Sequence, residues 1–145
     1  MKILIFGLPG SGKSTLAKPF ADLVNGVWIN ADQIRSEYND WDFSIEGRIR
    51  QAQRMRYISD GVVKAGKIAV TDFVCPTPHA RSEFGADFTV WMDTIDAGRF
   101  EDTNKVFEKP DLATVDYHVE KWFDNTHEPL SYAVQRYMKW KENNV

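Results

Sequence analysis

The stretch GLPGSGKST, residues 7–15, decides the fold. It carries the pattern Gly-x4-Gly-Lys-Ser directly after the apolar run KILIFG, residues 2–7, which predicts a strand buried on both faces. Helical spacing of apolar residues follows over residues 13–24. In a glycine-rich loop between a strand and a helix, backbone N–H groups can close around phosphate oxygens, and the helix N-terminus adds a positive dipole. The sequence therefore predicts a nucleotide-binding phosphate loop.

The residues of this loop have expected tasks. The Lys13 ammonium would reach the β- and γ-phosphates of a nucleoside triphosphate, and the Ser14 hydroxyl would bind Mg²⁺. A glycine-rich turn that arose by chance is the alternative, and the position of the loop after the first strand argues against it. We predict ATP as the nucleotide, Mg²⁺ as its ion, and these ATP-binding residues: Leu8, Pro9, Gly10, Ser11, Gly12, Lys13, Ser14 and Thr15.

Strand patterns and helix patterns alternate along the rest of the chain. Strands are predicted at residues 27–30, 68–73, 88–93 and, with a weaker pattern, 115–119. Helices are predicted from near Asp32, from the N-cap Ser44 through Ala65 to Gly66, and from about Pro129 to Lys141. This alternation is typical of βαβ units. The sequence predicts one α/β domain over residues 1–145 with a P-loop NTPase fold, in which helices flank both faces of a central parallel sheet of about five strands.

Bulk composition limits the function classes. The 145 residues are 43% apolar with a net charge of −3, which suits one folded domain and argues against a dedicated nucleic-acid binder. The single cysteine, Cys75, excludes an internal disulfide and is expected to fill apolar space. No apolar run reaches membrane-spanning length and no signal peptide opens the chain, so we expect a soluble cytoplasmic protein without a membrane partner. The oligomeric state stays open, with a homodimer among the options.

Charged residues follow the predicted strands at 27–30 and 68–73. Because ligands of an open parallel sheet bind beyond the carboxyl ends of its strands, Asp32, Arg35 and Asp72 can face one crevice with the phosphate loop. Asp32 would orient a hydroxyl and take its proton or hold Mg²⁺, and a helix N-cap is the alternative. Arg35 would bind an anionic acceptor with its forked donors, and a solvated surface charge is the alternative. Asp72 would be a Mg²⁺ ligand, and an acid in a turn is the alternative.

Two classes of P-loop protein are compatible with the loop alone. Guanine-specific switch proteins bind their base with Asn-Lys-x-Asp, and the nearest match is Asn104-Lys105-Val106-Phe107, in which phenylalanine replaces the acid. The chain length and the charged residues after the second strand favour a kinase of small molecules. A nucleotide binder without catalysis is the third interpretation.

Three further segments carry a resemblance to a known family. They are NADQIR at residues 30–35, DFSIEGRIRQ at residues 42–51 and FVCPTPHAR at residues 73–81. With the phosphate loop, they resemble adenylylsulfate kinase, the family that uses ATP to phosphorylate the 3′-hydroxyl of adenosine 5′-phosphosulfate. They match in part the family patterns Asp-Gly-Asp-x-x-Arg, Phe-Ser-x-Glu-Asp-Arg-x-x-Asn and Phe-Ile-Ser-Pro-Tyr-Arg-x-x-Arg. The resemblance covers residues 1–93 and implies the same P-loop kinase fold.

The resemblance implies roles for the matched positions. Asp32 would contact the acceptor hydroxyl, Arg35 and Arg48 would bind the acceptor's anion, and Phe43 would stack on its adenine. Because Phe43 precedes the N-cap Ser44, a hydrophobic staple is the alternative for it. The implied acceptor-binding residues are Asp32, Arg35, Phe43, Arg48, Gln51, Phe73, Cys75 and Pro76. The predicted metal ligands are Ser14, Asp32 and Asp72.

Helical spacing separates the arginines of residues 44–65. Arg48 falls on the inward face of the predicted helix, and Arg50 and Arg54 fall on the opposite face, where we expect a solvated pair. The sequence also departs from the family patterns here, since Gly47 and Gln51 stand in place of an acid and an asparagine. Further departures are Cys75 for a serine, Thr77 for a tyrosine, and Asp72 for a small or hydroxyl residue.

The segment 94–115 is shorter and less basic than the family's lid after the fourth strand. A reduced lid would exclude water less completely. Arg99 is its candidate catalytic residue, beside Lys13 and Asp32 elsewhere, and a surface role is the alternative. We expect the aromatic residues that follow to pack the last helix onto the sheet, namely Trp122, Phe123, Tyr132, Tyr137 and Trp140.

The sequence therefore predicts an ATP- and Mg²⁺-dependent small-molecule kinase. The favoured acceptor is adenosine 5′-phosphosulfate or a close nucleotide relative. A kinase of another phosphorylated small molecule, or of a polynucleotide 5′ end, is the second interpretation.

Overall fold

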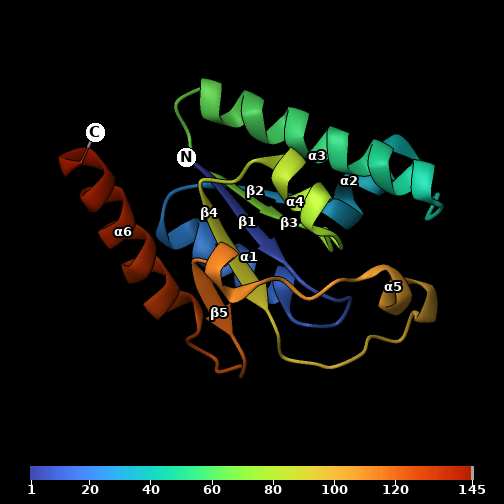
Figure 1. Ribbon diagram of the computed structural model, residues 1–145. Coiled ribbons are helices and arrows are strands. Elements are labelled where there is room, and N and C mark those ends of the chain that lie inside the picture. The colour runs from blue at the N-terminus through green and yellow to red at the C-terminus, as the bar shows by residue number, and fades with distance from the viewer. Residues whose placement is uncertain (145) are drawn as a thin grey trace.

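The computed structural model describes residues 1–144 and contains a five-stranded parallel sheet (Figure 1). The strands lie in the order β2-β3-β1-β4-β5, and every neighbouring pair is parallel. Their bounds are β1 Lys2–Phe6, β2 Val27–Asn30, β3 Ala69–Asp72, β4 Phe88–Met92 and β5 Tyr117–Val119. The predicted fold class is confirmed, including the weakly indicated last strand.

Helices cover both faces of the sheet (Figure 1). One face packs against α1 (Lys13–Leu23) and α6 (His127–Asn143), and the other against α2 (Ala31–Tyr38), α3 (Ile45–Lys64) and α4 (Pro78–Phe84). A short helix α5 (Glu101–Val106) and a 3-10 turn (Leu112–Thr114) lie between β4 and β5. The helices α4 and α5 were not predicted, because they are too short to show a clear apolar period.

The central strand β1 explains why the sheet is covered on both sides. Its side chains alternate between the two faces, so Ile3 and Ile5 join the core beneath α1 and α6, and Leu4 and Phe6 join the core beneath α3 and α4. All four are fully buried. The continuous apolar run of β1 is thus the sequence pattern of a doubly covered parallel strand.

The caps of two helices bear on the site. The Ser44 hydroxyl accepts a hydrogen bond from the Gly47 amide, so the predicted N-cap of α3 is confirmed. The cap of α2 is Asn30, whose Oδ1 accepts from the Gln33 amide at 3.0 Å. Asp32 is therefore not a helix N-cap, and the alternative interpretation of this acid is wrong.

The prediction for the tail aromatics is correct for Tyr137, whose ring packs against Phe88 of β4 with centroids 5.4 Å apart. Leu130 and Val134 lie on the same face of α6 as Tyr137, and both are fully buried against the sheet. The prediction is wrong for the other four, Trp122, Phe123, Tyr132 and Trp140, which are exposed; the Trp140 ring stacks on Tyr137 of its own helix rather than on the sheet.

The prediction that Arg50 and Arg54 form a solvated pair is correct for Arg50, whose side chain is 46% exposed, and wrong for Arg54, whose side chain is 16% exposed. Both guanidiniums donate to the Asp40 carboxylate at 2.7 Å, and Arg54 also lies over the Tyr38 ring. Helical spacing correctly put the two arginines on one face of α3. The loop of residues 39–43 covers that face, and no local sequence pattern specifies the course of this loop. No helix within residues 1–144 is long and apolar enough to cross a membrane.

Candidate active site

The phosphate loop joins the carboxyl end of β1 to the N-terminus of α1. Gly12 is the N-cap of α1 and has a φ of 96°, a conformation that favours glycine. The Lys13 Nζ donates to the Leu8 carbonyl at 3.0 Å, so the side chain folds back along the loop. Burial lowers the pKa of Lys13, and the nearby carboxylates of Asp72 and Asp32 partly oppose that effect. A cation held in this partly desolvated place is suited to bind phosphate oxygens.

Asp72 lies at the end of β3, directly beside the phosphate loop. Its side chain is 2% exposed, which excludes the alternative of an acid in a surface turn. The Asp72 Oδ1 accepts a hydrogen bond from the Ser14 hydroxyl at 3.2 Å, and the Trp28 indole and Asn30 amide donate to the same carboxylate. Burial raises the pKa of Asp72, and these donors and Lys13 oppose the rise.

The pair formed by Ser14 and Asp72 has the donor chemistry of a magnesium site. Mg²⁺ prefers oxygen ligands and is usually held by one or two protein groups together with substrate phosphates and water. The described part of the chain holds no group of three His, Cys, Asp or Glu side chains that could bind a metal by itself. The residues present therefore fit a Mg²⁺ ion that arrives with a nucleotide.

A cavity of about 460 Å³ opens between α2, α3, α4 and the ends of β2 and β3. Apolar side chains from α3, α4 and the β3–α4 segment form much of its wall, with charged groups at several points. Every residue that the resemblance assigns to the acceptor lines this cavity: Asp32, Arg35, Phe43, Arg48, Gln51, Phe73, Cys75 and Pro76.

Arg35 is the most deeply set cation of the cavity. It is 5% exposed, so the alternative of a solvated surface charge is wrong. Its Nη1 donates to the carbonyls of Asp40 and Asp42 at 3.0 and 3.2 Å, and its guanidinium lies 4.3 Å from the Phe43 ring centre. Burial lowers the pKa of Arg35, and Asp40 opposes that effect. This guanidinium is held in place before any ligand binds.

Arg48 approaches Phe43 from α3. Its Nε donates to the Phe43 carbonyl at 3.0 Å, and its guanidinium lies 5.6 Å from the centre of the ring. Its Nη2 donates to the Thr103 hydroxyl of α5 at 2.9 Å, with Asp102 3.7 Å away. The ring of Phe43 is 47% exposed, and its neighbours here are cations rather than the apolar partner of a hydrophobic staple. The two arginines and the ring therefore form one cluster.

The remaining acceptor-site candidates are well fixed. Gln51 donates from Nε2 to the Ala31 carbonyl at 3.0 Å, which ties α3 to the start of α2. Cys75 is buried among apolar side chains, as predicted, and burial raises the pKa of its thiol to about 12. Phe73 packs edge-on against Phe84 of α4. Together with Pro76, these side chains form the floor of the cavity.

The segment after β4 lies against the phosphate loop. The Thr94 hydroxyl donates to the Ser11 carbonyl at 2.7 Å, and a smaller cavity of about 170 Å³ separates Leu8 from Phe107. Arg99 belongs to this segment and is exposed, with its guanidinium over the neighbouring Phe100 ring. This contact does not show whether Arg99 reaches the phosphates when a nucleotide binds, so its catalytic role stays a prediction.

Two side chains of this region were not predicted as site residues. The ring of Trp122, in the loop between β5 and α6, lies 3.6 Å from the place that a Cβ on Gly12 would take. Arg81 donates to the carbonyls of Cys75, Pro76 and Glu108 and fixes the wall beside the cavity. The family pattern contains an arginine at this position, and it could have indicated Arg81. Nothing in the local sequence indicates that Trp122 reaches the loop.

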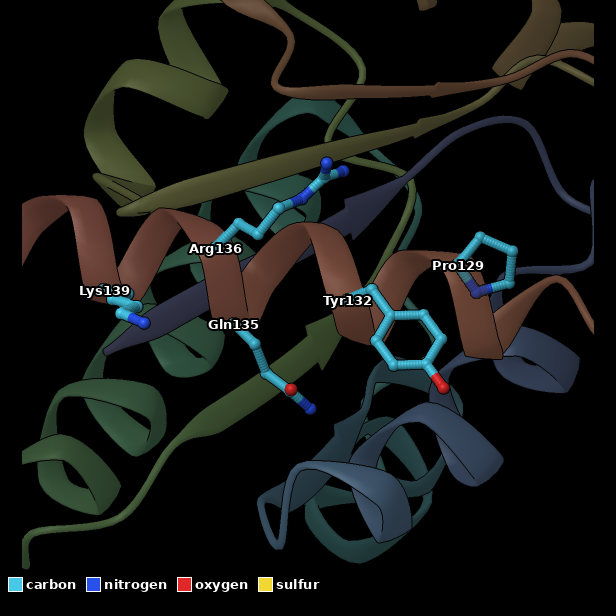
Figure 2. A pocket seen from close by; sticks show the side chains of 5 residues that line it. All are labelled: Pro129, Tyr132, Gln135, Arg136 and Lys139. Atoms are coloured by element: carbon cyan, nitrogen blue, oxygen red, sulfur yellow. The ribbon is translucent and has the colours of Figure 1, made fainter.

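A second hollow, of about 510 Å³, runs along α6 (Figure 2). Figure 2 shows Arg136 on one side of the helix and Tyr132 and Gln135 on the other, so these side chains do not converge. The hollow contains no residue of the phosphate loop or of the acceptor cavity. We therefore place the candidate site at the carboxyl ends of β1, β2 and β3.

A phosphate loop with a buried acid beside its serine, next to a cavity at the neighbouring strand ends, defines the class of P-loop kinases. Within that class, the chain belongs to the adenylylsulphate kinase family, because the model of this family matches residues 1–109. A probable adenylyl-sulfate kinase of Aeropyrum pernix is 31% identical over 86 residues, which are 55% of this chain and 47% of the relative. The match thus spans about half the length of this curated relative.

Solved structures agree on the fold. An APS kinase of Mycobacterium tuberculosis, in complex with AMPPNP and APS, has a TM-score of 0.73 at 16% identity and covers 92% of this chain and 96% of that one. A gluconokinase from Sinorhizobium meliloti has a TM-score of 0.69 at 14% identity and covers 99% of this chain and 96% of that one. Because kinases with different names share this fold, the acceptor has to be argued from the site.

Proposed function

We propose that this protein transfers the γ-phosphoryl group of ATP to the 3′-hydroxyl of adenosine 5′-phosphosulfate. The observation that carries the proposal is the composition of one cavity. Next to the phosphate loop it combines an acid, two arginines and an aromatic ring, each at the position that the family patterns assign to the acceptor. Membership in the adenylylsulphate kinase family supports the same acceptor.

The strand order indicates how ATP would be oriented in the site. The acceptor cavity lies at the ends of β2 and β3, and the phosphate loop follows the central strand β1. The γ-phosphate of ATP has to point toward the acceptor, so its nucleoside end extends to the opposite side, over β4 and β5. The loop after β5 lies on that side and brings Trp122 against Gly12. An exposed indole there can stack on a purine base.

Each group of the acceptor cavity has a matching part of the ligand. The forked donors of Arg35 and Arg48 suit the phosphosulfate, because guanidinium groups bind such anions through paired hydrogen bonds. Phe43 offers an aromatic surface to the adenine. Asp32 lines the same cavity, where its carboxylate can orient the attacking hydroxyl and accept its proton.

The remaining residues act on the transferred phosphoryl group. Lys13 neutralises charge on the β- and γ-phosphate oxygens, and Arg99 adds positive charge when the segment after β4 closes. Ser14 and Asp72 would hold Mg²⁺, directly or through water, with Asp32 as the third candidate ligand. A Mg²⁺ ion held there would supply positive charge that offsets the charge developing on the transferred phosphoryl group.

A panel of acceptors tests the proposal. The protein is incubated with ATP and Mg²⁺, and ADP release is followed with adenosine 5′-phosphosulfate, AMP, gluconate, shikimate and a 5′-hydroxyl oligonucleotide. We expect the highest kcat/KM for adenosine 5′-phosphosulfate. A higher value for an acceptor without an adenine base would replace this assignment with another small-molecule kinase. ADP release that no acceptor stimulates would indicate a nucleotide binder without transferase activity.

Replacing Arg48 by Lys should impair acceptor binding selectively. Lysine keeps the charge but cannot form the planar pair of hydrogen bonds, and a hydrogen bond to a charged group contributes about 1.5–3 kcal/mol. We expect the acceptor KM to rise by about 10- to 100-fold, whereas the KM for ATP changes little. Steady-state kinetics with each substrate varied in turn measures both constants. An unchanged acceptor KM would remove Arg48 from the acceptor site.

Replacing Trp122 by Ala should have the reverse selectivity. Stacking of a base on an aromatic side chain contributes about 1–3 kcal/mol, so the KM for ATP should rise by about 5- to 100-fold while the acceptor KM stays constant. Trp140→Ala is the matched control, because Trp140 is exposed on α6. Equal effects of the two variants would indicate that Trp122 does not contact the nucleotide.

A further inference from the structure

The loop of residues 39–43 connects α2 to α3 and determines where Arg35 lies. The only protein hydrogen bonds that the described residues provide to the Arg35 side chain come from this loop, through the carbonyls of Asp40 and Asp42. The ring of Phe43, at the end of the loop, lies over the same guanidinium. The positions of the deepest cation and of the aromatic surface therefore depend on one short stretch of backbone.

The side chain of Asp40 anchors that backbone to α3. Its Oδ2 accepts from Arg50 Nε and Arg54 Nη2, each at 2.7 Å, and its Oδ1 accepts from the Asp42 amide at 3.2 Å and from Arg50 Nη2 at 3.1 Å. The Asp40 side chain is only 13% exposed. Hydrogen bonds from the two arginines keep the pKa of this carboxyl well below its usual range, so it is ionised under all ordinary assay conditions.

The loop packs directly on the first turn of α3. A Cβ on Gly47 would lie 2.2 Å from the Asp42 carbonyl oxygen and 2.6 Å from the Asp42 carboxyl carbon. The adenylylsulfate kinase pattern has an acid at the position of Gly47, and any side chain there would collide with the loop as it lies in this chain. The absence of that side chain lets Asp42 approach the helix, where its carboxylate accepts from Arg50 at 3.2 Å.

The same network reaches the cavity by a second route. Arg54 Nη1 donates to Gln51 Oε1 at 3.0 Å, and Gln51 donates in turn to the Ala31 carbonyl. Gln51 and Ala31 line the acceptor cavity, whereas Asp40 does not. Asp40 thus supports Arg35 through its own carbonyl and Gln51 through Arg54, although Asp40 does not line the cavity.

We infer that Asp40 is a positioning residue of the acceptor site, which aligns Arg35 and Phe43 through the loop of residues 39–43 and Gln51 through Arg54. The inference uses one part of the proposed function, namely that this cavity binds the acceptor. The identity of the acceptor does not enter, because any anionic ligand of Arg35 would depend on the same alignment.

The test compares Asp40→Asn with the parent protein, using the acceptor that the panel identifies. Asparagine keeps the size of the side chain but loses the charge and one acceptor atom that the two arginines share. We expect the acceptor KM to rise by about 10- to 100-fold, since misplacement of a binding group by about 1 Å has effects of this size. The KM for ATP should stay within about twofold and kcat within about threefold. Asp40→Glu, which restores the carboxylate, should recover part of the loss.

Asp87→Asn is the matched control. Asp87 accepts a hydrogen bond from the Lys2 amide at the opposite end of the sheet and lies 3.8 Å from Lys141. Its replacement also turns a hydrogen-bonded carboxylate into an amide, far from the cavity, and should leave the acceptor KM unchanged. The melting temperatures of both variants are measured beside the KM values, so that a loss of stability is distinguished from a change in acceptor binding.

A double-mutant cycle with Arg35→Ala shows whether Asp40 acts through Arg35. If it does, Arg35→Ala combined with Asp40→Asn should raise the acceptor KM little more than Arg35→Ala alone.

Hydrogen exchange of the Asp42 amide, which donates to Asp40, should be faster in Asp40→Asn whether or not any acceptor is turned over. An unchanged acceptor KM, equal rises for acceptor and ATP, full additivity in the cycle, or unchanged exchange would each overturn the inference. Rejection of adenosine 5′-phosphosulfate by the parent protein would overturn only the proposed acceptor.

Discussion

Lys13→Ala should lower turnover by about 10³-fold or more while the protein stays folded. In the structure, the Lys13 ammonium donates to the Leu8 carbonyl within the loop, and burial lowers its pKa. A cation in that position is poorly compensated until phosphate oxygens bind, so its removal should affect the transition state far more than the fold. Measuring kcat and the melting temperature of the same preparation separates the two effects.

Lys18→Ala is the control for this prediction. Lys18 lies on the same helix, α1, and is exposed. We expect its replacement to leave kcat unchanged. Near-normal turnover of folded Lys13→Ala would contradict the kinase interpretation of the phosphate loop, since no other cation of the loop could replace Lys13.

Asp32→Asn should lower kcat by about 10²- to 10⁴-fold with little change in the KM for ATP, because a general base acts on the proton that is transferred in the transition state. The structure sharpens this expectation. Asn30, not Asp32, caps α2, so the variant should lose less than about 1 kcal/mol of stability, the size of a charge interaction with the first turn of a helix. Kinetics and thermal unfolding of the same variant measure both quantities.

Glu37→Gln provides the comparison for Asp32, because it also neutralises an exposed carboxylate on α2. We expect nearly unchanged kcat for Glu37→Gln. If Asp32→Asn retained most of its turnover, another group would have to accept the proton, and Asp32 would be limited to binding.

The sequence was a reliable guide where local chemistry decides the structure. The loop of residues 7–15 requires a strand before it and a helix after it, and the continuous apolar run of β1 requires cover on both faces. These two constraints led to the confirmed parallel sheet. Ser44 was predicted correctly as a cap because a serine before a helical pattern provides its own hydrogen-bond acceptor.

The sequence was a poor guide where long-range contacts decide the structure. Asn30 and Asp32 are equally good caps by residue type, and the register of β2 selected Asn30. The hydrogen bonds of Arg50 and Arg54 depend on a loop that folds over α3. The spacing of apolar residues in the sequence does not indicate the course of this loop. Trp122 reaches the phosphate loop because β5 pairs with β4 at the edge of the sheet, a tertiary fact that places its loop beside Gly12.

Family membership and cavity composition support different parts of the account. The family match supports a kinase with a phosphate loop, and the cavity supports a nucleotide-like, anionic acceptor. The departures from the family patterns at Gly47 and Gln51 concern the cavity and its support rather than the phosphate loop. The structure gives both a local reason, since Gly47 makes room for Asp42 and Gln51 joins α3 to α2. With these departures present, Arg35, Phe43 and Arg48 still form one cluster.

The fate of the γ-phosphoryl group tests the central claim most directly. The protein is incubated with ATP labelled at the γ-phosphate, Mg²⁺ and adenosine 5′-phosphosulfate, and the labelled products are separated and identified. The account predicts label on the 3′-oxygen of the acceptor, in an amount equal to the ADP formed. Label found only in inorganic phosphate, or on a base-free acceptor while adenosine 5′-phosphosulfate stays unlabelled, would contradict it.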